Sequence, residues 1–94
     1  MSGLQLSTAT QRATKALNEA SAKLTARSFR PEMLATIHCE DGSMFLVDSA
    51  FLETWTDPES EDKWIFLFAE HYPSMCFPEE DVIGRANYDR TPLS

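Results

Sequence analysis

The segment 64–69, WIFLFA, is apolar at every position. In an extended strand, successive side chains point to opposite faces, so both faces of this segment need cover from other parts of the chain. The segment is too short to span a membrane, and its aromatic content favours a strand over a buried helix. We therefore predict a central strand over residues 63–70, with the other elements arranged around it.

An amphipathic helical region is predicted over residues 7–30, before this strand. Ser7 or Thr8 provides an N-cap, and Pro31 disfavours helical geometry at the residue before it. A narrow apolar stripe recurs at helical spacing and consists of Ala13, Ala16, Leu17, Ala20 and Leu24. Because the stripe is mostly alanine, the helix is marginal alone and needs a surface to pack on, either the sheet of its own chain or another copy of itself.

Two strands are predicted over residues 33–39 and 44–48. The dipeptide Asp41-Gly42 lies between them, and Asp-Gly between apolar runs is typical of tight hairpins. Residues 49–55 are ambiguous, because they fit either a bulged extension of the sheet or a helical turn capped by Ser49.

After the central strand, the sequence predicts a turn over 71–74 and a short returning strand over 75–77. Pro78 then occupies the first position of a predicted helical turn, followed by three acidic residues in its first turn. Val82 and Ile83 are expected to pack inward, with Gly84 ending the turn.

This order predicts an α+β fold, with the N-terminal helix packed on a small antiparallel sheet of four to five strands and a short C-terminal helical turn. A small, partly open β-barrel with flanking helices is the alternative. The chain is divided into a disordered start, an amphipathic helix, an antiparallel β domain with acidic loops and a loose tail, over residues 1–6, 7–30, 31–84 and 85–94.

The net charge of −7 is unevenly distributed along the 94 residues. Residues 1–32 carry five basic and two acidic side chains, a net charge of +3, whereas residues 33–94 carry three basic and thirteen acidic side chains, a net charge of −10. The acidic part should repel nucleic acid and anionic membranes and attract basic proteins. We expect a larger basic partner, and no direct binding to nucleic acid or membrane.

Two acidic clusters and two aromatic residues are the candidate partner-binding residues. They are Asp57, Glu59, Glu61 and Asp62 in the first cluster, Glu79, Glu80 and Asp81 in the second, and Trp55 and Tyr72 beside the loops. Acidic runs most often form a solvated surface, and the aromatic residues fit a half-buried core equally well. The functional interpretation is an interaction face with rim aromatics as anchors.

The cysteines and histidines give weaker signals. Cys39, Cys76, His38 and His71 include the residue types of a zinc site, but adjacent strand residues point to opposite faces and no Cys-x-x-Cys motif is present. We predict no metal, no cofactor and no catalytic residues. With two cysteines, no apolar signal region and no membrane-length apolar run, the expected setting is cytoplasmic with reduced thiols.

The resulting hypothesis is a non-enzymatic protein-binding module that acts as an inhibitor or assembly factor through its acidic surface. A small inhibitor of the phage-encoded type, imitating nucleic acid on a basic partner, is one form of it. The alternatives are a small metal- or thiol-dependent enzyme that uses the histidines and cysteines, and a structural homodimer joined through the N-terminal helix.

Overall fold

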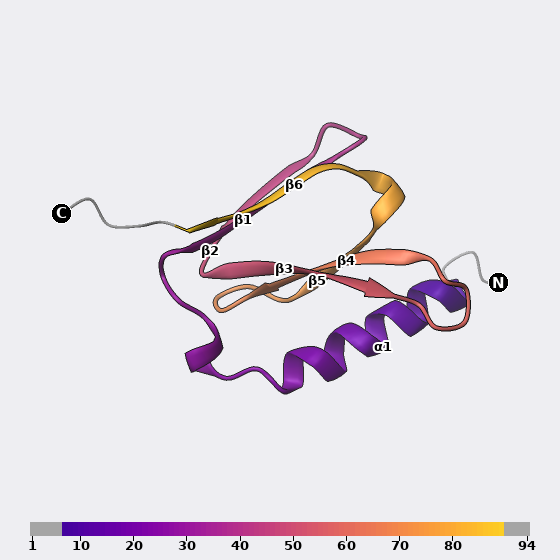
Figure 1. Ribbon diagram of the computed structural model, residues 1–94, viewed down its shortest axis with the longest axis horizontal. Coiled ribbons are helices and arrows are strands. Elements are labelled where there is room, and N and C mark those ends of the chain that lie inside the picture. Colours follow the sequence, from indigo (N-terminus) through magenta and orange to yellow (C-terminus); the bar gives the residue numbers. More distant parts are fainter. Residues whose placement is uncertain (1–6, 90–94) are drawn as a thin grey trace.

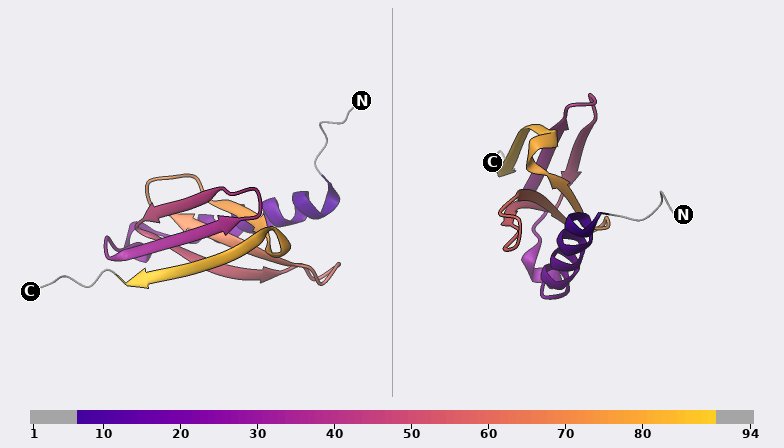
Figure 2. Two further views of the ribbon diagram at one scale, coloured as in Figure 1. Left: turned by 90° about the horizontal axis from the view of Figure 1, so that it is seen from above. Right: turned by 90° about the vertical axis from the view of Figure 1, so that its right-hand side faces the viewer.

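The computed structural model describes residues 7–89, which fold into three layers. The elements in chain order are α1 (Thr8–Ala22), the 3-10 helix η1 (Ala26–Ser28), β1 (Met33–Cys39), β2 (Met44–Asp48), β3 (Ala50–Thr56), β4 (Lys63–Ala69), β5 (Met75–Pro78), the 3-10 helix η2 (Glu79–Asp81) and β6 (Val82–Asp89). The strands form two antiparallel sheets ordered β2-β1-β6 and β3-β4-β5. Figures 1 and 2 show the second sheet between the first sheet and α1.

The fold is therefore α+β, as predicted, but its strands are divided between two three-stranded sheets. The prediction of a single sheet of four to five strands is corrected, because the chain turns a corner between β2 and β3 and begins a second sheet there. The alternative of a small, partly open β-barrel does not describe the arrangement either, because the strands form two separate sheets. Among the described residues, no helix is both long and apolar enough to cross a membrane.

Strand β4 lies in the middle layer and is buried on both faces, which confirms the prediction from its apolar sequence. Its odd-numbered residues pack between the two sheets with Ala35, Ile37 and Ala50. Its even-numbered residues, Trp64, Phe66 and Phe68, form an aromatic layer under α1.

Helix α1 packs its predicted stripe on this aromatic layer of its own chain. Ala13 and Leu17 are buried against it. Ser7 is the N-cap, and its Oγ accepts a hydrogen bond from the backbone N–H of Thr10 at 3.1 Å. The helix ends earlier than the predicted 7–30 region, at Ala22, and a separate 3-10 turn follows.

The corner between β2 and β3 is made by Ser49, a buried residue with a φ of 53°. Its N–H donates to the carbonyl oxygen of Met33 at 2.6 Å, and its own carbonyl accepts from the N–H of Glu70 at 3.1 Å. These bonds tie the corner to the start of β1 and the end of β4. The ambiguous segment 49–55 is thus mainly strand β3, and the predicted Asp-Gly hairpin is present, with Gly42 at a φ of 93°.

Strand β6 was not predicted. The helical turn is the three-residue η2, and the chain then pairs with β1 from Val82 to Asp89. The prediction of a loose tail is therefore wrong for residues 85–89, whereas 90–94 and the predicted disordered start 1–6 lie outside the described residues. Ile83 does not pack inward, since 69% of it is exposed.

The polar face of β6 has a structural role. Asn87 lies opposite Ala35 of β1, on the inner side of the sheet, and its Oδ1 accepts a hydrogen bond from the backbone N–H of Leu52 at 3.0 Å. This bond satisfies a donor on the edge strand β3 and links the two sheets.

Candidate functional site

The loop between β3 and β4 is organised around Asp57, whose side chain is fully buried. Its backbone N–H donates to the carbonyl of Asp62, and its carbonyl accepts from the N–H of Glu61, both at 2.8 Å. Its carboxylate accepts a third bond from the N–H of Glu59 at 2.9 Å. The loop is therefore closed on itself, with Glu61 held at a φ of 65°.

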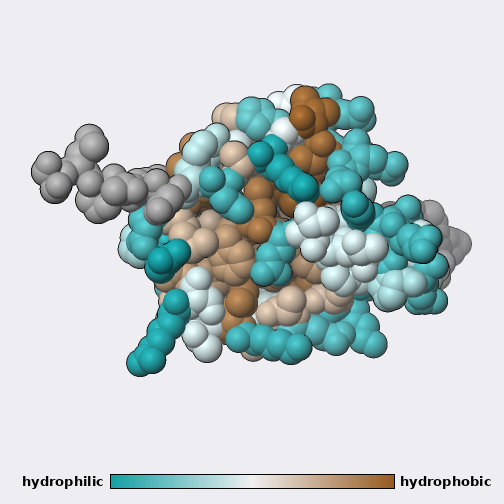
Figure 3. Space-filling view, viewed as in Figure 1, coloured by the Kyte–Doolittle hydropathy of each residue, from teal (hydrophilic) through white to brown (hydrophobic). Residues whose placement is uncertain are grey.

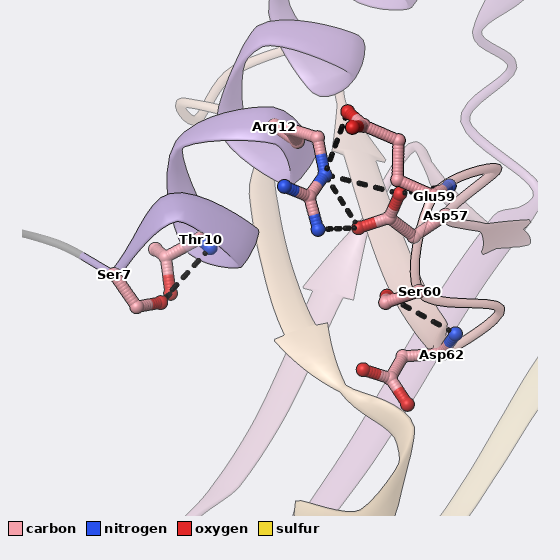
Figure 4. A network of polar contacts seen from close by, with 7 residues as sticks. All are labelled: Ser7, Thr10, Arg12, Asp57, Glu59, Ser60 and Asp62. Carbon is pink, nitrogen blue, oxygen red and sulfur yellow. Dashed lines mark hydrogen bonds and ion pairs between the residues drawn. The ribbon is translucent and has the colours of Figure 1, made fainter.

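Arg12 of α1 fastens this loop to the helix (Figure 4). Its Nε lies 2.9 and 3.1 Å from the two carboxylate oxygens of Asp57, and its Nη2 lies 2.8 Å from Oδ2. Glu59 is a second, more exposed ion-pair partner at 3.4 Å. The hydrogen bond from Arg12, opposed by burial and aided by the N–H of Glu59, lowers the pKa of Asp57 to about 2.

Because the loop is fixed beside the helix, the two acidic clusters meet in one groove of about 700 Å³. Residues from the start of α1, from the β3–β4 loop and β4, and from the end of β5 with η2 line it. They are Ser7, Ala9, Thr10, Glu61, Asp62, Lys63, Trp64, Pro78, Glu79 and Glu80. We call this feature the acidic groove.

Carboxylates dominate the acidic groove. Glu61, Asp62, Glu79 and Glu80 oppose a single lysine among its lining residues, for a net formal charge of −3. Trp64 also lines the groove but is only 6% exposed, so the carboxylates are the groups that a ligand would meet. A carboxylate rim suits a guanidinium or an ammonium group, which can form ion pairs and hydrogen bonds with it. Hydrophilic residues gather at the right-hand end of Figure 3, where α1 and the β3–β4 loop begin, and apolar side chains show nearer the middle.

The nine predicted binding residues are not all in this groove. The prediction that Asp57 is a partner-binding residue is corrected. Its carboxylate is buried and paired with Arg12, so it is not presented to a partner. Glu59 is not one of the lining residues of the groove, and its carboxylate forms an ion pair with Arg12. Asp81 lines a separate hollow of about 410 Å³ with Cys39 and Phe77.

The two predicted anchor aromatics have different positions. Trp55 is half-buried and stacks on Phe66, with ring centroids 5.5 Å apart, so it belongs to the aromatic layer. Tyr72 is 61% exposed in the β4–β5 turn. That turn lies toward the C-terminal end of α1, where the Oγ atoms of Ser21 and Ser74 are 3.2 Å apart. The acidic groove lies at the opposite end of the helix.

Sequence reasoning missed Lys63, Trp64, Pro78 and the helix start as parts of the groove. Trp64 and Pro78 are cross-strand partners in β4 and β5, which brings the second acidic cluster beside the first. A signal was present, since both acidic clusters adjoin strands that were predicted to be hairpin neighbours.

The thiols are free and lie apart. Cys39 packs between the sheets, whereas Cys76 packs in the aromatic layer under α1. Burial raises the pKa of both thiols, which disfavours the nucleophilic thiolate. His71 is exposed and lies 3.2 Å from Glu70. Within residues 7–89, no group of three or more histidine, cysteine or acidic side chains is arranged to hold a metal ion.

Comparisons with protein-family models, with curated proteins and with solved structures gave no match for this chain.

Proposed function

We propose that this protein is a binding module that docks its acidic groove on a basic segment of a larger protein, as an inhibitor or an assembly factor. The observation that carries the proposal is the meeting of two acidic clusters, separated by strands β4 and β5, in one groove. If the acidic residues served only to keep the surface solvated, the two clusters would not need to lie in one groove.

The groove's charge and rigidity both favour such docking. A concentration of negative potential accelerates encounter with a positively charged partner and makes association sensitive to salt. The loop that carries Glu61 and Asp62 is already held by the Arg12–Asp57 pair. Because this loop is ordered before binding, less conformational entropy is lost when the partner docks.

The negative charge of the acidic groove has the same sign as that of phosphate. The groove therefore suits basic side chains of a protein better than a polynucleotide. Lysine or arginine of the partner would pair with the rim carboxylates. If the partner normally holds nucleic acid, the same carboxylates would occupy its phosphate-binding surface. This form of the proposal is an inhibitor that imitates nucleic acid.

A matched pair of double variants tests the groove. Glu61→Gln/Glu80→Gln removes two exposed charges from the groove, and Glu19→Gln/Glu53→Gln removes two exposed charges from α1 and β3. Each variant and the wild type are immobilised and exposed to nuclease-treated lysate of the source cell or its host, and retained proteins are identified. The proposal expects a basic protein retained by the wild type and the control variant and lost by the groove variant.

Affinity for that protein is then measured with purified components. We expect the groove variant to bind at least about tenfold more weakly than the control, and wild-type affinity to fall as salt is raised. Added nucleic acid should compete if the protein imitates it. Equal binding by the two double variants, or affinity independent of salt, would overturn the proposal.

A further inference from the structure

The outer face of the β2-β1-β6 sheet is an ordered three-by-three array of side chains. Cross-strand neighbours share a face, so the strand register defines three rows. The rows are Asp48-Leu34-Tyr88, Leu46-Thr36-Ala86 and Met44-His38-Gly84, each in the order β2, β1, β6. We call this array the outer face.

The outer face exposes large apolar side chains. Met44, Leu46 and Tyr88 are 59%, 58% and 50% exposed, whereas Thr36, at the centre of the array, is 5% exposed. In the array, Asp48 is the one acidic residue and His38 the one basic residue, although the chain carries a net charge of −7. A contiguous exposed apolar patch indicates an interaction surface, whereas apolar residues exposed singly are common on any protein.

We propose that a second copy of this chain binds the outer face, in a two-fold symmetric dimer. A basic partner of the kind that suits the acidic groove would gain little from a face with one carboxylate. A second copy of an acidic chain, in contrast, can approach only where acidic residues are few. The outer face meets that condition.

The array is complementary to itself under one particular rotation. A two-fold axis that runs across the strands along the middle row places the first row of each copy on the third row of the other. Tyr88, the bulkiest side chain of the array, then faces Gly84, which has no side chain. Leu46 and Ala86 face their own copies across the axis.

The same rotation keeps the acidic residues of the two copies apart. The two Asp48 side chains lie at opposite ends of the array, because the first row of each copy faces the third row of the other. The acidic hairpin tip, with Glu40 and Asp41, lies beyond the third row. The two tips are therefore placed at opposite ends of the dimer, which limits repulsion between the copies.

The size of the face sets the expected strength. Three strands with five residues each cover roughly 15 by 17 Å before side chains are added, which places the interface at the small end of specific contacts. We expect reversible association with a Kd of about 10 µM to 100 µM. The proposal does not depend on the function of the acidic groove.

Sedimentation velocity over about 1 µM to 1 mM protein tests the dimer directly. Leu46→Lys places two lysines at the axis, and Tyr72→Lys introduces a lysine at an equally exposed residue in the β4–β5 turn, away from the outer face. Leu46→Lys should weaken association by at least about tenfold, and Tyr72→Lys should not.

Gly84→Val tests the two-fold arrangement. A Cβ at this position would lie 3.8 Å from the Cβ of His38, an ordinary contact, so the monomer can accept the substitution. Valine also favours strands, and circular dichroism should show an unchanged or higher melting temperature. The valine side chain would occupy the space that Tyr88 of the second copy needs opposite position 84. It should therefore weaken association by at least about tenfold.

Concentration-dependent dimerisation that is lost in Leu46→Lys and Gly84→Val, but kept in Tyr72→Lys, would support the proposal. A wild-type protein that stays monomeric over the whole range would overturn it. Dimerisation unaffected by either face variant would assign the contact elsewhere, and loss in Leu46→Lys alone would overturn the two-fold arrangement. A chain ending at Asp89 that dimerises while the full chain stays monomeric would assign the face to residues 90–94 instead.

Discussion

Arg12 and Asp57 are 45 residues apart in sequence, yet the guanidinium Nη2 lies 2.8 Å from a buried carboxylate oxygen. This contact joins the start of α1 to the loop that carries two of the four carboxylates of the acidic groove. It gives the one arginine of the helix a structural role and removes one acid from the surface.

Arg12→Ala should destabilise the fold, because it leaves the buried Asp57 carboxylate without its charged partner. We expect a melting temperature about 5 to 10 °C lower than the wild type. Lys15→Ala is the matched control, since it removes an exposed positive charge from the same helix and should leave the melting temperature within about 2 °C. Equal melting of the two variants would show that the ion pair does not stabilise the fold.

The low pKa of Asp57, about 2, makes a defined contribution to the pH dependence of stability. A carboxyl whose pKa is lower in the folded than in the unfolded protein stabilises the fold above its unfolded pKa of about 4, and this stabilisation is lost as pH falls toward 2. Urea unfolding from pH 7 to pH 2 should therefore show wild type more stable than Asp57→Asn near neutrality. The difference in the free energy of unfolding between the two proteins should narrow between about pH 5 and pH 2. A difference that stays constant would contradict this account.

Leu17→Ala should remove much of the anchoring of α1 on the aromatic layer. Leu17 is 4% exposed, and it is one of two fully buried residues of a stripe otherwise made mainly of alanine. We expect a loss of about 2 to 3 kcal/mol in the free energy of unfolding. The exposed Asn18→Ala, on the same turn, should change it by less than about 0.5 kcal/mol in the same urea titration.

The Ser49 corner predicts opposite outcomes for two substitutions. At a φ of 53° a β-branched side chain is strained, so Ser49→Val should lower the free energy of unfolding by about 2 kcal/mol. Glycine accepts this conformation, so Ser49→Gly should stay within about 1 kcal/mol of the wild type. Similar losses in both variants would show that the hydroxyl, and not the backbone geometry, matters at the corner.

The local pattern of the chain was sufficient for the central strand, the Asp41-Gly42 hairpin and the capped helix. In each case the deciding feature spans only a few residues: the unbroken apolar run of β4, one tight turn, and the hydrogen bond of Thr10 to Ser7. An apolar segment of six residues requires cover on both faces wherever it is placed in a fold. Its central position therefore follows from composition alone.

Strand β6 shows why other elements could not be found in this way. Its inner positions carry Arg85 and Asn87, whereas Tyr88 points outward, so its polarity is inverted relative to an ordinary edge strand. The inversion is explained by the bond from the Leu52 N–H to Asn87 across the gap between sheets. Nothing near residue 87 in the sequence indicates that partner.

The acidic residues show the same limit. Their clustering along the chain is visible in the sequence, but Asp57, Asp62 and Glu80 look equivalent there. Packing of α1 decided that Asp57 is buried against Arg12, while pairing of β4 with β5 placed Asp62 and Glu80 in one groove. Short-range patterns determine the central strand, the hairpin and the capped helix, whereas contacts between distant residues determine which charges hold the fold together and which stay exposed in the acidic groove.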